Sequence, residues 1–218
     1  MKTIHIQDIK EDLTIGKIVC VGRNYADHAS ELGNQIPDKP ILFLKPASSV
    51  IYSGDKIQIP SFTNDMHHEV ELVLVIGKDI KNADGIQADE AITAYGVGLD
   101  MTLRDVQNEL KKNGHPWTIA KCFDTSTVLS SFVSRKLNKL TLKETISLSV
   151  NGNLRQSAKL GTMIFYPVKL VQYISTVMKL EHGDLIFTGT PAGVGKVIHG
   201  DKISASITGI AELQCDVE

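Results

Sequence analysis

Short runs of apolar residues, separated by residues that favour turns, dominate the chain. Runs of this length, bounded by Gly, Asn and Asp, are typical of β-strands. The dipeptide Asn151-Gly152 predicts a tight hairpin turn between two extended segments. The segments expected to form strands are 17–21, 40–44, 56–60, 69–76, 146–150, 185–188 and 202–207. The pattern therefore predicts a β-rich fold.

Two other segments show helix signals. Thr102 and Asp105 are spaced as a capping box, which predicts a helix that runs from there to Gly114. A second helix is predicted to begin near Pro167 and to end before Gly183. Its apolar stripe consists of Leu170, Val171, Ile174, Val177 and Met178. This stripe predicts a helix that packs against the sheet region.

The composition is that of an ordinary globular protein. The chain has 218 residues, of which 42% are hydrophobic and 22% charged, and its formal net charge is −2. We therefore expect a single domain over residues 1–218, with residues 1–15 as an amino-terminal strand or extension. No block of Lys and Arg is interleaved with aromatic residues, so nucleic acid is not an expected partner.

Three features predict a cytoplasmic protein. The longest uninterrupted aliphatic run, residues 72–76, is far shorter than the roughly 20 residues of a spanning helix, so no membrane insertion is expected. The first residues alternate between apolar and polar instead of forming a signal peptide. Cys20, Cys122 and Cys215 are odd in number and far apart, which favours buried, reduced thiols over a disulfide or zinc framework.

Candidate chemistry begins at Glu69 and Glu71, at the start of the run 69–76. Successive strand side chains point to opposite faces, so both carboxylates would share one face while Val70 points to the other. Burying two carboxylates beside aliphatic residues is costly unless a cation lies between them. The alternative is a half-exposed edge strand whose acids are solvated.

Asp100 ends a second apolar stretch and favours the metal interpretation. Three carboxylates without a Cys suit the hard cations Mg2+, Mn2+ or Ca2+ better than Zn2+. In a regular strand, His68 would face away from the two glutamates and His67 would share their face. We expect both histidines to pack or to support the site instead of binding the metal.

The segment 22–32 carries a second candidate group. His28 and Glu31 are three residues apart, so one helical turn would bring them to the same face. The carboxylate could then orient the imidazole and stabilise its protonated form, as in a general-base pair. A solvated surface helix is the competing interpretation, and the spacing alone favours that alternative.

Further polar residues follow the expected metal site. Arg104 and Gln107 would share a helix face just after Asp100 and project near the metal, although exposed helices also carry such residues for solubility. Lys121 lies among apolar and aromatic neighbours, which argues against a purely solvated role. It could supply fixed positive charge.

Two glycine-rich segments fail as nucleotide-binding motifs. Segment 189–196 has one residue too many between its outer glycines, and Val197 stands where a phosphate loop needs Ser or Thr. Gly96 and Gly98 lack the third glycine of a dinucleotide fingerprint, and Asp100 follows them. Neither ATP nor a nicotinamide cofactor is therefore expected.

Several short motifs occur in a characteristic order. They are Gly22-Arg23-Asn24-Tyr25 with His28 and Glu31; His68-Glu69-Val70-Glu71-Leu72; Gly98-Leu99-Asp100-Met101-Thr102 with Arg104 and Gln107; Pro116-Trp117 with Ala120-Lys121; and Thr188-Gly189-Thr190-Pro191-Ala192-Gly193-Val194-Gly195. As an ordered set they resemble the fumarylacetoacetate hydrolase family, most closely its short acylpyruvase-like branch. The resemblance covers about residues 16–218, essentially the whole chain.

The resemblance implies an α+β, β-rich fold, a mixed β-sandwich roll with a few flanking helices, assembled as a homodimer. It also implies a catalytic Mg2+ or Mn2+. Matched residue by residue, it makes Glu69, Glu71 and Asp100 the metal ligands.

The resemblance assigns the remaining site residues as well. His28 and Glu31 would form a catalytic dyad on a mobile lid of about residues 23–35, and Lys121 would also be catalytic. The residues expected to contact the substrate are Arg23, Arg104, Gln107, Lys121 and Thr190.

The expected activity is hydrolysis of the carbon–carbon bond of an acylpyruvate, such as acetylpyruvate or fumarylpyruvate, to release pyruvate. Such a small-molecule 2-oxo acid can chelate the metal through its carboxylate and 2-oxo oxygen. Decarboxylation or keto–enol tautomerisation of oxaloacetate, and isomerisation of the 2-hydroxyhepta-2,4-diene-1,7-dioate type, are alternatives that use a similar enolate. A noncatalytic metal- or metabolite-binding protein is the alternative from another class.

Overall fold

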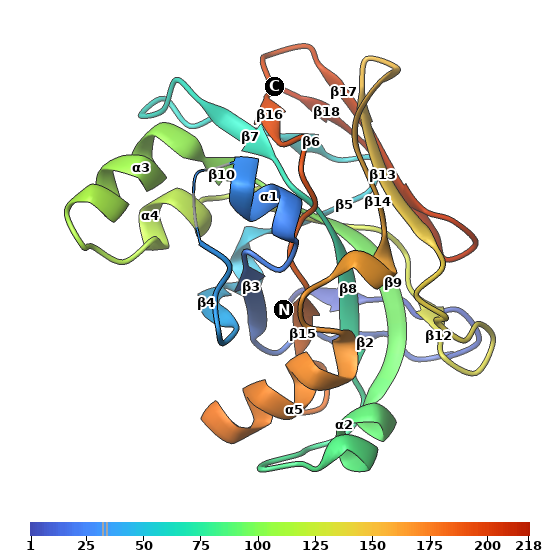
Figure 1. Ribbon diagram of the computed structural model, residues 1–218. Coiled ribbons are helices and arrows are strands. Elements are labelled where there is room, and N and C mark those ends of the chain that lie inside the picture. Colours follow the sequence, from blue (N-terminus) through green and yellow to red (C-terminus); the bar gives the residue numbers. More distant parts are fainter. Residues whose placement is uncertain (32, 34) are drawn as a thin grey trace.

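Two large β-sheets, two small ones and a few helices make up the part of the chain that the structure describes, residues 1–31, 33 and 35–218 of a computed structural model (Figure 1). The strands are β1 (Thr3–Ile4), β2 (Leu13–Thr14), β3 (Ile18–Gly22), β4 (Ile41–Lys45), β5 (Val50–Tyr52), β6 (Lys56–Ile57), β7 (Met66–His68), β8 (Val70–Ile76), β9 (Ile92–Asp100), β10 (Thr102–Leu103), β11 (Thr127–Leu129), β12 (Val133–Ser134), β13 (Thr145–Val150), β14 (Asn153–Lys159), β15 (Leu185–Phe187), β16 (Gly195–Lys196), β17 (Lys202–Ile207) and β18 (Ala211–Val217). The α-helices are α1 (Ala26–Glu31), α2 (Gly85–Ala91), α3 (Arg104–Lys112), α4 (Thr118–Lys121) and α5 (Pro167–Val177), and short 3-10 turns are found at Ala47–Ser49 and Leu160–Thr162.

The two large sheets pack face to face. Within the described residues, the larger sheet has eight strands, in the order β4-β3-β15-β8-β9-β11-β5 with β12 paired to β9. The second sheet has five, in the order β14-β13-β17-β18-β6. β13, β17 and β18 lie against β8 and β9, and the main hydrophobic core fills the space between them. The predicted β-rich sandwich with flanking helices is confirmed.

Strand β8 shows why residues 72–76 are apolar without alternation. It lies between β15 and β9 in the larger sheet, and all its residues are buried. Leu72 and Leu74 belong to the core between the sheets, whereas Val73 and Val75 belong to a second cluster on the opposite face. A strand that is covered on both faces has no solvent side, so apolar residues occupy every position from 72 to 76.

The predicted hairpin is present. β13 and β14 pair in antiparallel fashion, with Val150 opposite Asn153. Asn151 and Gly152 form the turn with φ angles of 52° and 78°. Asn and Gly tolerate the positive φ that a two-residue hairpin turn requires, so this sequence specifies the turn locally.

The capping box predicted for α3 is wrong. The N-cap position is Leu103, which makes no side-chain capping bond. Thr102 lies in β10 instead, where its hydroxyl donates to the carbonyl of Asp100 at 3.0 Å and accepts from Lys121 at 2.6 Å. Thr102 therefore bonds within the interior of the protein and not to the helix. The predicted end is correct, since Gly114 follows the helix with a φ of 68°.

The amino-terminal segment forms a separate two-stranded sheet that packs against the larger sheet. β1 pairs with β2, and Ile4, Ile6 and Ile15 join the second hydrophobic cluster. Cys20, Cys122 and Cys215 are free thiols; Cys20 and Cys215 are buried as predicted, whereas Cys122 is only partly buried. Among the described helices, none combines the length and hydropathy needed to cross a membrane. The division into a single domain with this extension stays a prediction.

Candidate active site

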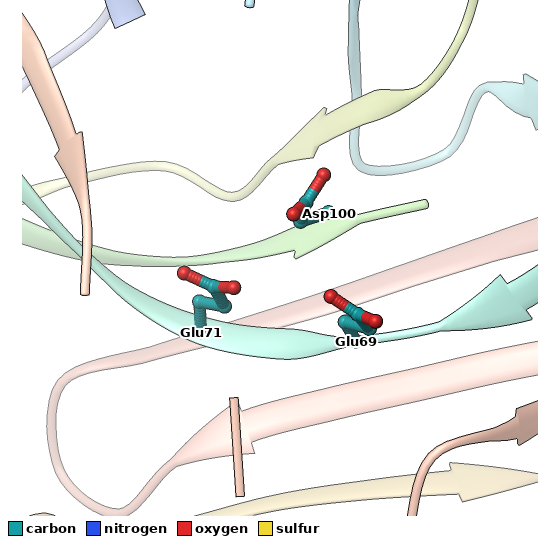
Figure 2. A group of neighbouring side chains, drawn as sticks. All are labelled: Glu69, Glu71 and Asp100. Carbon is teal, nitrogen blue, oxygen red and sulfur yellow. The ribbon is translucent and has the colours of Figure 1, made fainter. Parts of the chain in front are cut away.

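Three buried carboxylates meet where β8 and β9 pair (Figure 2). Glu69, Glu71 and Asp100 each offer one oxygen, and these oxygens lie within 4.8 Å of one another. The three residues are 5%, 2% and 0% exposed, which rules out the alternative of a solvated edge strand. The group is compact enough for one cation to contact all three side chains.

Strand pairing brings these acids together. Glu71 pairs with Gly98 across β8 and β9, and the backbone N–H of Asp100 donates to the carbonyl of Glu69 at 2.9 Å. Val70 is buried in the main core, while both glutamate side chains rise from the same side of the strand in Figure 2. The alternation predicted from Glu-Val-Glu is therefore present in the structure.

Three buried cations surround the acids. The Lys121 ammonium donates to Glu69 at 2.8 Å and to Asp100 at 2.5 Å, and so bridges them. Lys45 donates to the other oxygen of Asp100 at 2.7 Å, and Arg104 pairs with Glu69. The prediction placed Arg104 and Lys121 near the acids but missed Lys45.

The ion pairs hold two of these groups in their charged forms. Burial alone would raise the pKa of Glu69, but Lys121 and then Arg104 lower that pKa well below its usual range. Burial alone would lower the pKa of Lys121, but Asp100 and Glu69 raise it well above its usual value. Lys121 is therefore a fixed positive charge and not a proton acceptor at neutral pH.

Glu71 is the acid that lacks a cationic partner among the described residues. One of its oxygens accepts the backbone N–H of Gly189 at 2.6 Å. Burial, followed by the charges of Asp100 and Glu69, raises the pKa of Glu71 well above its usual value. A cation between the three carboxylates would remove this cost. Carboxylate oxygens are the donors that Mg2+ and Mn2+ prefer, so the residues fit the predicted metal.

His28 and Glu31 form the pair predicted from their spacing. α1 brings His28 Nδ1 within 3.4 Å of Glu31 Oε2, and the backbone N–H of Gly193 also donates to Glu31, at 3.1 Å. His28 is 5% exposed, so the solvated-helix alternative fails for it. Burial lowers the pKa of His28 despite the opposing charge of Glu69 and the bond from Glu31. The imidazole of His28 is therefore neutral and able to accept a proton.

The start of the predicted lid is tied to the sheet region by Asn24, a residue to which the sequence analysis gave no role. The Asn24 amide donates to the carbonyls of Thr188 at 2.7 Å and Phe165 at 2.9 Å, and its oxygen accepts the N–H of Phe165 at 2.7 Å. Of the predicted lid, 23–35, residues 32 and 34 lie outside the described part. Motion of the lid stays a prediction.

Gly189 shows how the glycine-rich segment 189–196 is used. Its φ of 93° is favoured only by glycine, and an added Cβ would lie 2.7 Å from Cβ of Asn24. The close approach lets the Gly189 N–H reach Glu71. The segment therefore supports the acid cluster.

Gln156 is a buried site residue that sequence analysis missed. Its Oε1 accepts the N–H of Val70 at 3.1 Å, and its Nε2 donates to the carbonyl of Pro191 at 2.8 Å. Backbone groups have fixed polarity, so these two bonds set the orientation of the amide. Nε2 then also donates to the Thr190 hydroxyl, at 2.7 Å, and the Thr190 hydrogen stays available for another acceptor.

The two histidines before Glu69 contact polar neighbours, and their supporting role stays a prediction. His68 Nδ1 lies 3.0 Å from Oε1 of Gln156, which can only accept, so this nitrogen of His68 carries the hydrogen. His67 Nε2 lies 3.0 Å from a carboxylate oxygen of Asp65. Neither histidine belongs to the acidic group found among the described residues.

A cavity of about 30 Å³ joins these groups. Arg104 donates to Gln107 at 2.5 Å on one of its walls, and Arg104 Nε has no partner among the described residues. The lining residues are Val21, Gly22, Arg23, His28, Phe43, Glu69, Glu71, Asp100, Arg104, Gln107, Lys111, Trp117, Lys121 and Thr190. Every predicted site residue except Glu31 lines this cavity, and Glu31 reaches it through His28.

The fold and the buried acid cluster define a β-rich protein with a site suited to a hard divalent cation. Residues 17–218 match the family described as Fumarylacetoacetate (FAA) hydrolase C-terminal. The chain therefore belongs to the fumarylacetoacetate hydrolase family, and the resemblance seen in the ordered motifs is confirmed.

Named relatives are enzymes. The chain is 48% identical over 202 residues to the mitochondrial oxaloacetate tautomerase of Arabidopsis thaliana, covering 93% of this chain and 91% of the relative. It is 46% identical over 203 residues to a mitochondrial oxaloacetate decarboxylase of Dictyostelium discoideum, covering 92% and 93%. The crystal structure of fumarylpyruvate hydrolase from Pseudomonas aeruginosa, in complex with Mn2+ and pyruvate, superposes with a TM-score of 0.95 at 37% identity, covering 99% of this chain and 95% of that one.

Proposed function

We propose that this protein forms and protonates the enolate of oxaloacetate, and that keto–enol tautomerisation is its main reaction. The observation that carries the proposal is the content of one cavity: three buried carboxylates, the fixed charge of Lys121 and a neutral His28. The similarity to an oxaloacetate tautomerase and an oxaloacetate decarboxylase supports oxaloacetate as substrate. Tautomerisation of oxaloacetate therefore replaces acylpyruvate hydrolysis, which was expected first from the sequence, as the leading activity.

Glu69, Glu71 and Asp100 would hold Mg2+ or Mn2+. When bound, the ion supplies Lewis-acid stabilisation of negative charge on a 2-oxo acid. The Mn2+ and pyruvate in the related fumarylpyruvate hydrolase structure support this assignment.

The residues of the chain have separate tasks in the proposed reaction. His28 is the proposed base, because its pKa is lowered and the neutral imidazole can take a proton from carbon 3 of the keto form. Glu31 holds the imidazole in position through its bond to Nδ1. Lys121 stabilises the negative charge that develops on the 2-oxo oxygen, since its ammonium is already oriented before the reaction. The protonated His28 then gives that proton to the 2-oxo oxygen, which yields the enol, and the reverse sequence returns the keto form.

The charges of the cluster favour a dianion. Lys45, Arg104 and Lys121 balance the three carboxylates in formal charge. A bound divalent ion would then leave two net positive charges in a buried site, which matches the two carboxylates of oxaloacetate. Arg104 Nε and the Thr190 hydroxyl, both without another acceptor among the described residues, would donate to the substrate carboxylate beside the metal.

A panel assay tests the proposal. Purified protein would receive oxaloacetate, acetylpyruvate or fumarylpyruvate with Mn2+, while ultraviolet absorbance follows the enol and a coupled assay follows pyruvate. The proposal expects the fastest metal-dependent conversion with oxaloacetate, visible as enol–keto exchange before pyruvate appears. Pyruvate release that is faster from an acylpyruvate would contradict it.

Acylpyruvate hydrolysis is the second candidate. The His28–Glu31 pair favours it, because an imidazole oriented by a carboxylate can activate a water that attacks a carbonyl. Cleavage of the carbon–carbon bond would release the pyruvate enolate, and Lys121 would stabilise that product. Turnover of none of the three substrates would leave the noncatalytic metal- or metabolite-binding alternative.

We also propose that the protein is a cytoplasmic homodimer. The assembly is expected from the family resemblance, and the location from the three free cysteines, which suit a reducing compartment. Light scattering coupled to size-exclusion chromatography would measure the mass in solution; a mass equal to the 23.8 kDa chain would contradict the dimer.

A further inference from the structure

Helix α3 presents a polar stripe to the cavity. Arg104, Gln107 and Lys111 are spaced at i, i+3 and i+7, so they lie on one face of the helix. All three line the cavity. Helical side chains lean toward the amino-terminal end, so the long side chain of Lys111 leans back toward Gln107 and Arg104. The stripe therefore extends the site by about one further helical turn beyond the residues that sequence analysis selected.

Lys111 differs from the other lysines of the site in having no acidic partner. Lys45 is ion-paired to Asp100 and Lys121 to both Asp100 and Glu69, whereas the described residues include no ion pair to Lys111. Its ammonium lies 5.4 Å from the centroid of the Trp117 ring. An aromatic face attracts a cation but does not neutralise it. The positive charge of Lys111 is thus available to a ligand.

Neighbouring charges make this end of the cavity repulsive for cations. The pKa of Lys111 is lowered to about 8, first by burial and then by the positive charges of Arg104 and Arg23. The charge of Glu69 opposes this shift, and that of Lys121 adds to it. The described residues include no ion pair to Arg23 either, and Arg23 also lines the cavity. Arg104 is already bonded to Glu69 and Gln107. A negative group beside Lys111 and Arg23 would relieve the repulsion.

We propose that Lys111, with Arg23 beside it, binds the second carboxylate of a dicarboxylate substrate and so selects dicarboxylates over monocarboxylates. This rests on the proposed function, in which the 2-oxo acid end lies against the acid cluster and Lys121. The opposite end of the substrate then lies near Lys111 and Arg23, which have no acidic partner among the described residues. Oxaloacetate and fumarylpyruvate carry such a second carboxylate, and acetylpyruvate does not.

A matched pair of ligands tests the subsite by binding. Malate and 2-hydroxybutyrate share the 2-hydroxy acid end and a four-carbon chain, and differ in a terminal carboxylate or methyl group. Isothermal titration of the Mn2+-loaded protein would compare wild type with Lys111→Met, Lys111→Arg and Lys112→Met. Methionine keeps the apolar stem against Trp117, and Lys112 is the exposed neighbour on the same helix.

Lys111→Met should weaken malate binding about tenfold, because it removes one charge-assisted contact. Binding of 2-hydroxybutyrate should change less than about twofold, because it has no group at the distal end. Lys111→Arg should restore the preference for malate, and Lys112→Met should leave both affinities near those of wild type. A general loss of structure would instead weaken both ligands together.

Three results would overturn the subsite: equal weakening of both ligands by Lys111→Met, no weakening of malate, or failure of wild type to prefer malate. The substrate panel separates these from failure of the proposed function. If no 2-oxo acid is converted but Lys111→Met selectively weakens malate binding, the subsite is supported and the proposed reaction is refuted. If oxaloacetate is converted and Lys111→Met weakens binding of both ligands equally, the proposed reaction is supported and the subsite is refuted.

Discussion

The two halves of the site are built very differently. In the acid–cation cluster, the carboxylates Glu69, Glu71 and Asp100 lie at buried strand ends, and several short ion pairs join them to the surrounding lysines and Arg104. The dyad lies on the short helix α1, where a 3.4 Å contact joins His28 to the partly exposed Glu31. The cluster fixes charge in place, whereas the dyad holds a proton acceptor by few bonds.

This difference assigns separate tasks to the two halves. Buried charges stabilise a developing negative charge well only when they are already oriented, which the cluster provides. A base must change its protonation in each turnover, so it needs a pKa that is not locked by a strong ion pair. Substitutions in the cluster should therefore alter metal binding and stability, and substitutions in the dyad should alter rate.

The largest effect is expected from Glu71→Gln. Loss of a direct ligand should weaken Mn2+ binding by more than about 100-fold and abolish metal-dependent turnover. The metal-free variant should melt no lower than wild type, because the raised pKa of Glu71 shows that its charged form is disfavoured by folding. Titration with Mn2+ and calorimetry measure the two effects, with the exposed Glu212→Gln as control. Mn2+ affinity equal to that of wild type would refute the ligand assignment.

His28→Ala should lower turnover by about 100-fold to 10,000-fold, as expected for a lost general base. Mn2+ affinity should stay close to that of wild type, because His28 belongs to the dyad and not to the acidic group. Steady-state rates and a Mn2+ titration would be compared with those of the exposed His199→Ala. An unchanged rate would remove His28 from the mechanism.

Lys121→Met should destabilise the metal-free protein by about 3–5 kcal/mol, because it leaves Glu69 and Asp100 buried without their bridging cation. Urea unfolding would measure this, with the exposed Lys202→Met as control. A loss below about 1 kcal/mol, the size expected of surface pairs, would show that the cluster does not depend on this bridge.

The smallest expected effect is a shift in the pH profile. Turnover should fall as the pH drops through the pKa of His28, with a midpoint below the ordinary value of 6.5. Because the bond from Glu31 raises this pKa, Glu31→Gln should move the midpoint to lower pH. Asp27→Asn, at an exposed position on the same helix, is the control. A midpoint that moves upward in Glu31→Gln would contradict the proposed pairing.

The sequence revealed those parts of the site whose neighbours are close in the chain. Strand alternation placed Glu69 and Glu71 on one side, and helical spacing paired His28 with Glu31. The Asn151-Gly152 turn is likewise specified by the local φ preferences of its two residues. In these cases, local geometry alone decides which atoms meet.

Residues that depend on sheet packing could not be found in this way. Lys45 ends β4, which β3, β15 and β8 separate from β9 in the sheet order, so its bond to Asp100 requires the curvature of the whole sheet. Gln156 lies on a strand with many exposed residues, and only packing against β8 and the 189–196 segment buries it. Thr102 had the right spacing for a cap, but bonds to Lys121 and Asp100 decided its place.

The most direct test of the account is the rate of enol-to-keto conversion of oxaloacetate by wild type and Glu71→Gln, each with Mn2+ or with chelator. Rapid conversion is expected only of wild type with Mn2+. The other three samples should show the rate of the uncatalysed reaction. Equal rates with Mn2+ and chelator, or full activity of Glu71→Gln, would contradict a metal-dependent enolate site at these three carboxylates.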